Sequence, residues 1–177
     1  MPLPSSSVVD LDRLSFEPLS PLSFLDRAAA AHGDRVGVVD QDREWTYREL
    51  RERAGRLAGL VAARATGSPV AVLAPNDHVH LEAHFGVPLA GLPLVAINTR
   101  LSAGEVAYIL DHARVDLALC HPDLRDLMDA AVARCGRSVE VVSTGAGYDE
   151  LLASHDPVDR RPGDERALLS INYTSGT

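Results

Sequence analysis

The C-terminal residues of the chain have the types and spacing that favour phosphate chemistry. An apolar stretch, Ala167 to Ile171, runs directly into Asn172 and a series of small and hydroxyl-bearing residues. Glycine lets backbone N–H groups turn toward an anion, and serine and threonine hydroxyls add further donors. A buried strand followed by such a loop predicts a cradle for phosphate groups. The candidate nucleotide-binding residues are Thr174, Ser175, Gly176 and Thr177.

The composition is that of an acidic globular protein. The 177 residues suffice for one domain with its own core, and 46% hydrophobic with 24% charged residues is ordinary for such a domain. The formal net charge of -8, with arginines scattered along the chain, argues against a nucleic-acid partner and an anionic membrane surface. No stretch approaches the roughly 18 uninterrupted apolar residues that span a bilayer. We therefore expect a cytoplasmic protein without a membrane span.

The cysteines and the N-terminus fit the same expectation. Cys120 lies near the end of an apolar run and Cys135 lies in an expected helix, which favours reduced thiols over a disulfide. Residues 1–20 lack the basic and continuous apolar regions of a secretory signal, so we interpret them as a flexible leader. Residues 21–177 then form a single domain.

Hydrophobic periodicity alternates between helical and strand-like segments along this domain. Apolar residues at helical spacing, some of them after capping residues such as Thr46 and Ser102, indicate helices, and short apolar runs indicate buried strands. The expected helices are 21–32, 47–65, 78–90, 102–113, 123–135 and 148–153, and the expected strands are 35–40, 43–46, 69–74, 92–97, 116–120, 138–143 and 167–173. This alternation predicts an α/β fold, in which a layered parallel or mixed sheet carries flanking helices. Residues 155–166, rich in Asp, Arg and Pro, are interpreted as a linker.

Three segments, in their order and rough spacing, resemble the adenylate-forming superfamily of acyl-CoA synthetases, peptide synthetase adenylation domains and firefly luciferases. They are Trp45 to Leu50, Leu89 to Leu101 and Leu169 to Thr177. The phosphate loop of the superfamily has the general form Tyr-Thr-Ser-Gly-Ser/Thr-Thr-Gly-x-Pro-Lys-Gly, and Tyr173 to Thr177 match its first five positions. Asn98 to Leu101, followed by Glu105 and Tyr108, resembles the free-standing acyl-CoA ligases more than the peptide synthetase branch.

The resemblance implies a two-step reaction. A carboxylate attacks the α-phosphate of ATP to give an acyl-adenylate and pyrophosphate, and the thiol of CoA then displaces AMP. The expected cofactors are ATP, Mg²⁺ and CoA, the expected substrates are a small-molecule carboxylic acid and a nucleotide, and a homodimer stays open. Positions matching Thr174 to Thr177 would wrap the β- and γ-phosphates. The chain would be the first part of the large N-terminal domain, truncated inside the phosphate loop.

The other functional motifs of the superfamily lie downstream of the residues present, so no catalytic residue is assigned. We predict that residues 1–177 alone do not activate a carboxylate. The alternatives are a non-catalytic binding or interaction module derived from this fold, and an acyl-AMP ligase that loads a carrier protein. A P-loop NTPase is less well supported, because Gly-x-x-x-x-Gly-Lys-Ser/Thr is absent from the sequence.

The histidines invite a metal-site interpretation, which we weigh against a structural one. Of His78, His80 and His84, only the last two have the four-residue helical spacing that lets two imidazoles share a metal. No cysteine or carboxylate arrangement completes such a site, so surface or crevice-lining histidines are favoured and no metal ligand is assigned. His112 and His121 flank a helix and a strand and are interpreted as structural.

The arginines receive plain structural interpretations. Arg100 is expected to orient a neighbouring loop by pairing with a carboxylate such as Glu105, in preference to touching a substrate. The arginines between Arg48 and Arg64 are interpreted as the solvated face of a helix.

Overall fold

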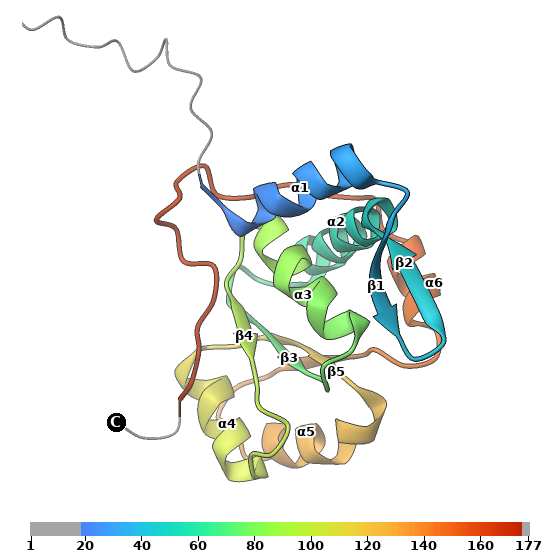
Figure 1. The fold of residues 1–177 in the computed structure, drawn as a ribbon. Coiled ribbons are helices and arrows are strands. Elements are labelled where there is room, and N and C mark those ends of the chain that lie inside the picture. The colour runs from blue at the N-terminus through green and yellow to red at the C-terminus, as the bar shows by residue number, and fades with distance from the viewer. Residues whose placement is uncertain (1–18, 175–177) are drawn as a thin grey trace, which may run out of the picture.

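A four-stranded parallel sheet forms the centre of the computed structural model, which describes residues 19–174 (Figure 1). In spatial order the strands are β4 (Leu94–Ala96), β3 (Val70–Leu73), β5 (Leu117–Cys120) and β6 (Glu140–Ser143). Every residue of β3 and β5 is buried, which explains why these strands read as continuous apolar runs. The predicted α/β architecture with a parallel sheet is confirmed.

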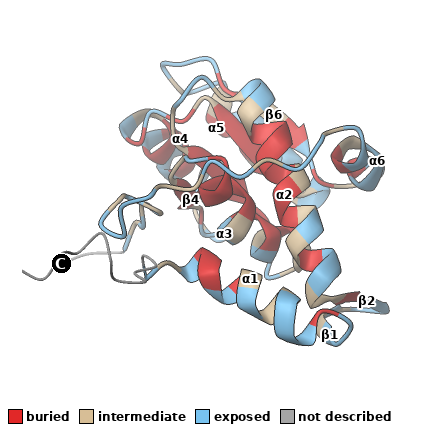
Figure 2. Cartoon of the chain, turned by 90° about the horizontal axis from the view of Figure 1, so that it is seen from above, coloured by how far each residue is buried: buried red, intermediate tan, exposed pale blue. Residues whose placement is uncertain are grey.

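Helices cover both faces of this sheet because successive strand residues point to opposite sides. Val70 and Val72 belong to the core beneath one helical layer, and Ala71 and Leu73 to the core beneath the other. The first layer holds α1 (Pro21–His32), α2 (Tyr47–Arg64), α3 (His78–Leu89) and α6 (Tyr148–Ala153), and the second holds α4 (Ala103–His112) and α5 (Arg125–Val132). Figure 2 shows the buried residues gathered on the sheet and on the helix surfaces that face it.

An antiparallel hairpin precedes α2 and lies beside the first layer. It pairs β1 (Val36–Asp40) with β2 (Arg43–Thr46) and turns at Gln41, whose φ of 55° is left-handed. Thr46 then begins α2 with the expected capping box: its hydroxyl accepts from the backbone N of Glu49 at 3.2 Å, and its own backbone N donates to the Glu49 carboxylate at 2.7 Å. Ser102 and Glu105 form the same box at the start of α4.

The prediction that residues 155–166 form a linker is wrong, because this segment packs against the first helical layer. We call residues 154–167 the strap. Its Val158 N donates to Gly55 O of α2 at 3.0 Å, and its Arg160 N donates to Leu89 O of α3 at 2.6 Å. In Figure 1 the chain runs from α6 along α1 and then down past β4 toward its C-terminus. The strap therefore fixes where residues 168–174 reach the sheet.

The prediction of a strand over residues 167–173 is wrong in its length, because only Ser170 forms a β-bridge. A single parallel bridge joins Ser170 to Leu94, beyond the outer edge of β4. Its hydrogen bonds are Leu94 N to Leu169 O at 2.9 Å and Ile171 N to Leu94 O at 2.8 Å. The segment thus lies at the edge of the sheet, with no strand beyond it among the described residues.

The helix expected at 123–135 is also shorter than the pattern suggested. A 3-10 turn, η2 (Pro122–Leu124), comes first, and α5 then ends at Val132. Proline at the first position and the His121 side chain, which accepts from Asp123 N at 3.2 Å, set the start of this turn. His121 therefore has the expected structural role. Both cysteines are free thiols.

Residues 1–18 of the expected leader lie outside the described residues. Between residues 19 and 174, no helix combines the length and apolar character needed to cross a bilayer.

Candidate functional site

The segment that leads into the predicted phosphate loop leaves the sheet at the carboxyl edge of β4. Because the bridge between Ser170 and Leu94 is parallel, Asn172 and Tyr173 emerge at the same edge as Asn98, which follows β4. In open α/β sheets this edge is where ligands bind. Thr174 is the last described residue, and its side chain lies at the surface. Ser175, Gly176 and Thr177 lie outside the described residues, so their place in the site stays a prediction.

A pocket of about 410 Å³ opens beside Tyr173 and Thr174. Its other walls come from the end of β4, the following turn and the first two turns of α4. These residues are Ala96, Asn98, Leu101, Gly104, Glu105, Tyr108 and Ile109. The pocket thus places two members of the predicted loop opposite the segment whose sequence, Asn98 to Leu101 with Glu105 and Tyr108, carried part of the family resemblance.

The lining of this pocket is mainly apolar, with a few polar groups at the end formed by Asn98, Tyr173 and Thr174. The hydroxyl of Thr174 and the amide of Asn98 can donate hydrogen bonds, as the oxygens of a phosphate require. The described residues of the lining include no arginine or lysine, so they do not themselves offset the charge of a polyphosphate. They fit the edge of a nucleotide site and leave most of its charge compensation to other groups.

Magnesium ligands are not assembled at this pocket. Glu105 is the one carboxylate among the described lining residues. One oxygen of that group accepts from the backbone N of Ser102 at 2.8 Å and from the Ser102 hydroxyl at 2.7 Å. Within residues 19–174, no three His, Cys, Asp or Glu side chains gather in a way that could hold a metal ion. The described residues therefore do not fit a bound Mg²⁺ by themselves.

Tyr173 is held at the pocket by a histidine that the sequence pattern marked only as structural. Its hydroxyl lies 2.7 Å from His112 Nδ1, and the two rings meet edge to face with centroids 5.8 Å apart. His112 in turn stacks on Tyr108 at 5.4 Å. Partial burial raises the pKa of the Tyr173 phenol, and the nearby Tyr108 adds to this, so the hydroxyl stays protonated and able to donate.

The Arg100 prediction is wrong. The carboxylate of Glu105 is engaged in the cap of α4, and no ion pair joins Arg100 to any described carboxylate. The backbone N of Arg100 donates instead to the Asn98 side chain at 2.9 Å, while its own side chain is exposed. A capping box satisfies the carboxylate locally, which removes it as a partner for the arginine.

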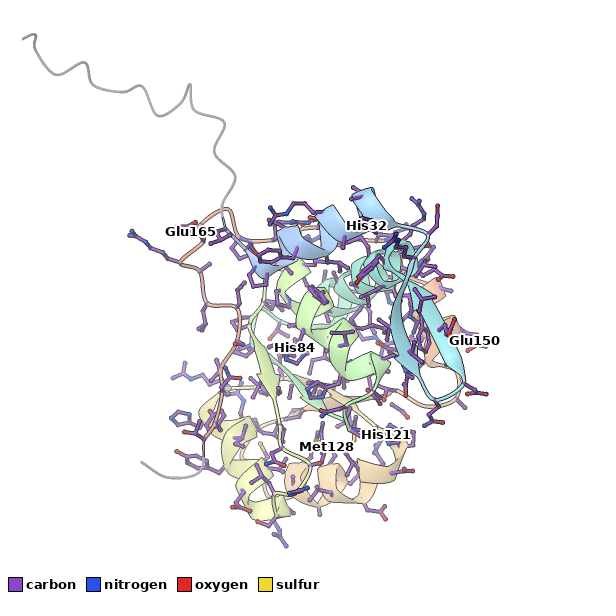
Figure 3. The ribbon with its side chains drawn as sticks, in the orientation of Figure 1. His32, His84, His121, Met128, Glu150 and Glu165 are labelled. Atoms are coloured by element: carbon purple, nitrogen blue, oxygen red, sulfur yellow. The ribbon has the colours of Figure 1, made fainter. Side chains whose placement is uncertain are left out.

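The histidines of α3 line a crevice, as the structural interpretation expected. His78, His80 and His84 face an opening of about 420 Å³ together with residues of β1 and the turn before α3. The rings of His80 and His84 are 5.0 Å apart. His78 Nδ1 lies 2.7 Å from the Asp40 carboxylate, which ties α3 to the hairpin. Figure 3 shows His84 on α3, and this opening shares no described lining residue with the pocket beside Tyr173.

The expectation that the α2 arginines form a solvated face is wrong for Arg53. This side chain is 15% exposed and pairs with Glu82 of α3, which is 1% exposed, and with Asp149 of α6 at 2.9 Å. The hydroxyl of buried Tyr148 also donates to Glu82, at 3.4 Å. Burial raises the pKa of Glu82, and the hydrogen bond and charge of Arg53 oppose that shift. No sequence signal marked this cluster, because a single Glu in an apolar helix shows its partner only after folding.

Comparison with known proteins gives this arrangement a family context. The family model described as AMP-binding enzyme matches residues 25–177. A peroxisomal acetate/butyrate–CoA ligase of Arabidopsis thaliana is 36% identical, with 92% of this chain and 34% of that protein covered. A long-chain-fatty-acid–CoA ligase of Thermus thermophilus is 38% identical, with 91% of this chain and 32% of that protein covered.

A solved structure has a similar fold. The anthranilate CoA ligase AuaEII, crystallised with anthranoyl-AMP, superimposes with a TM-score of 0.79 at 21% identity, over 88% of this chain and 31% of that one. The chain thus spans about a third of the length of the proteins it matches.

Proposed function

Because the chain belongs to the AMP-binding enzyme family, we propose that it is the N-terminal portion of an ATP-dependent acyl-CoA synthetase. In this proposal a carboxylate oxygen attacks the α-phosphorus of ATP, pyrophosphate leaves, and an acyl-adenylate forms. The thiol sulfur of CoA then attacks the acyl carbon, and AMP leaves. The two relatives named above are CoA ligases by name, which supports CoA as the acceptor over a carrier protein.

One observation carries this proposal. The bridge of Ser170 to Leu94 delivers Tyr173 and Thr174 to the carboxyl edge of the sheet, beside a pocket of about 410 Å³. That is the position at which a phosphate loop can meet a nucleotide. In the proposal Thr174, Ser175, Gly176 and Thr177 supply N–H and hydroxyl donors to the β- and γ-phosphates, where charge grows as pyrophosphate leaves.

The rest of the site must come from other parts of the enzyme. Among residues 19–174 the pocket has no cationic side chain and no free set of carboxylates, so we assign Mg²⁺ binding and the main charge compensation to groups other than these residues. On this ground we propose that residues 1–177 alone do not form an acyl-adenylate. We also propose a cytoplasmic enzyme with small-molecule substrates and no nucleic-acid partner, which the net charge of -8 supports, and leave a homodimer to direct measurement.

The test is carboxylate-dependent exchange between ATP and labelled pyrophosphate. Sequencing across the codon of Thr177 and intact mass first define the polypeptide that cells make. Two proteins are then assayed with acetate, butyrate and a long-chain fatty acid: residues 1–177, and any polypeptide that continues beyond them. We expect exchange from the longer polypeptide and none from residues 1–177.

The proposal has two clear points of failure. Pyrophosphate exchange by residues 1–177 would overturn the proposal that these residues alone do not form an acyl-adenylate. An absence of exchange by a longer polypeptide with every acid would overturn the synthetase assignment. In an active polypeptide, Thr174→Ala should raise the KM for ATP. Ser138→Ala is the matched control, because Ser138 is exposed and lies before β6, remote in sequence from the loop.

A further inference from the structure

The segment that enters the proposed phosphate loop depends on a side-chain contact for its position. Up to Ile171 it is held by backbone hydrogen bonds to Leu94. From Asn172 to Thr174, no backbone hydrogen bond to another described residue is made. The next anchor is the Tyr173 hydroxyl, 2.7 Å from His112 Nδ1. The direction of the chain after the sheet edge is therefore set by this hydrogen bond and by the packing of the Tyr173 ring against the core beneath α4 and α5.

His112 projects from a firmly held element. It is the last residue of α4, whose Val106, Ile109 and Leu110 are buried against the sheet. Its ring is exposed, so packing does not fix its orientation. The ring orientation is fixed by two neighbours instead. Tyr108, one helical turn earlier, stacks on one side of the ring, and Tyr173 contacts it edge to face. A rigid helix thus presents a defined hydrogen-bonding atom to the hydroxyl of Tyr173, whose ring also packs against the core beneath α4 and α5.

We propose that His112 is a positioning residue for the phosphate loop, holding the phenol of Tyr173 and thereby setting where Thr174 and the following residues meet the nucleotide. This inference rests on the proposed function, since only there does the loop's direction bear on catalysis. Reacting groups are sensitive to such placement, because shifts of about 1 Å can cost on the order of a hundredfold in rate.

The chemistry of the pair identifies a conservative substitute. Either the phenol donates to a neutral Nδ1, or a protonated Nδ1 donates to the phenol oxygen, so both forms of His112 can make the bond. An asparagine side chain can place an amide donor or a carbonyl acceptor near the position of Nδ1. His112→Asn should therefore retain the contact, and His112→Leu should lose it. Tyr173→Phe removes the same bond from the other side.

The test is hydrogen exchange measured by mass spectrometry on the purified 177-residue chain, following peptides from residues 168–177. The variants are His112→Leu, His112→Asn, Tyr173→Phe and the double variant His112→Leu/Tyr173→Phe. His32→Leu is the matched control, because His32 also ends a helix and its side chain makes no hydrogen bond to a described residue. Figure 3 places His32 at the end of α1, on the other side of the sheet from α4. Peptides from β3 and β5 report on global stability.

We expect His112→Leu and Tyr173→Phe each to speed exchange of the Ile171 amide about tenfold, with no further change in the double variant, because this N–H, which donates to Leu94 O, is the hydrogen-bonded amide next to the pair. His112→Asn and His32→Leu should match the parent chain, and the sheet peptides should be unchanged throughout. The inference is overturned if His112→Leu has no effect, if asparagine fails to rescue, if the two single effects add, or if the parent segment is already unprotected.

A second readout separates this inference from the proposed function. In a polypeptide that shows pyrophosphate exchange, His112→Leu should raise the KM for ATP or lower kcat about tenfold, with the KM for the carboxylate unchanged. Normal kinetics in that variant would overturn the positioning role while the synthetase assignment stands. Protection by His112 together with an absence of pyrophosphate exchange in a longer polypeptide, with every acid tested, would instead show that the synthetase assignment has failed.

Discussion

Arg53 of α2 and Glu82 of α3 form an ion pair within the helical layer, and the Glu82 side chain is only 1% exposed. The pair joins the two helices that make the most extensive contact in the protein, and Tyr148 and Asp149 connect it to α6. A buried carboxylate is costly unless it is paired and hydrogen-bonded. Arg53 therefore holds the helical layer together by neutralising a charge that the fold has already buried.

Removing Arg53 should be strongly destabilising. We expect Arg53→Met to lower the free energy of unfolding by about 3–5 kcal/mol, because Glu82 keeps its burial and loses its counter-charge. Urea unfolding followed by the fluorescence of Trp45, the only tryptophan, measures this. Arg48→Met is the control on the same helix, since Arg48 is 65% exposed and pairs with exposed Asp34, and it should cost less than about 1 kcal/mol. Equal losses in the two variants would contradict this account.

The same variant should respond to pH in a definite direction. Burial raises the pKa of Glu82 even in the parent chain, so its protonated form is the better tolerated one in the folded state. When a group has a higher pKa in the folded state than in the unfolded state, its protonation stabilises the native state at pH values below the unfolded-state pKa. That stabilisation is lost as the pH rises through the folded-state pKa. Arg53→Met should therefore lose less stability at pH 5 than at pH 8. A loss independent of pH would mean that Glu82 is not left charged.

Acid should release the strap. Arg51 of α2 and Arg161 of the strap each contact both Asp26 and Asp159. Burial opposes ionisation of Asp26, but both arginines lower its pKa on balance, and the hydrogen bond from Arg161 lowers the pKa of Asp159. A carboxyl group whose pKa is lower in the folded state stabilises the native state at pH values above its unfolded-state pKa. This stabilisation is lost as the pH falls through the folded-state pKa. We expect the free energy of unfolding to decline below about pH 4.

Substitution of Asp159 tests that assignment. Asp159→Asn should cost about 1 kcal/mol at pH 7, a modest figure because the side chain is 38% exposed, and should flatten the decline in acid. Asp156→Asn is the strap control, because Asp156 makes no ion pair with a described residue. An acid profile that Asp159→Asn leaves unchanged would place the titrating groups elsewhere.

The cap of α4 supports one wall of the pocket beside Tyr173. The hydroxyl of Ser102 accepts from Glu105 N, so Ser102→Ala leaves that donor unsatisfied and should cost about 1 kcal/mol, whereas Ser102→Gly should cost only a few tenths. Urea unfolding compares both with Ser138→Ala, an exposed position expected to change stability by less than about 0.5 kcal/mol. Equal costs for alanine and glycine would argue against a capping role.

Two helical glycines should respond oppositely to alanine. A Cβ at Gly59 of α2 would collide with the carbonyl oxygen of Asp156 in the strap, while one at Gly104 of α4 would have Arg134 Nη1 as its nearest atom, 3.9 Å away. Gly59→Ala should destabilise by about 1–3 kcal/mol and make the strap more sensitive to protease. Gly104→Ala should stabilise by about 0.5–1 kcal/mol, because alanine loses less entropy in a helix. A neutral Gly59→Ala would mean that the strap can move away from α2 at little cost.

Local patterns account for most of the architecture. The apolar run at Val70–Leu73 predicts a strand buried on both faces, and Thr46 with Glu49 predicts the start of a helix. Both predictions succeed because these features depend on a few neighbouring residues. The same locality explains the errors. Residues 155–166 look like a linker by composition, and Ala167 to Tyr173 look like a full strand, because neither pattern reveals what lies across the fold.

The site divides in the same way. The sequence alone was enough to identify the family and to predict a phosphate loop. It did so through the residues from Tyr173 onward together with two upstream segments, because the type and order of the donor groups are properties of the sequence. Only the tertiary structure placed Tyr173 and Thr174 at the sheet edge beside β4 and set His112 against Tyr173, 61 positions away. Contacts between such distant residues depend on how helices pack on the sheet, and packing depends on the complementary shape and charge of both partners, which no single segment contains.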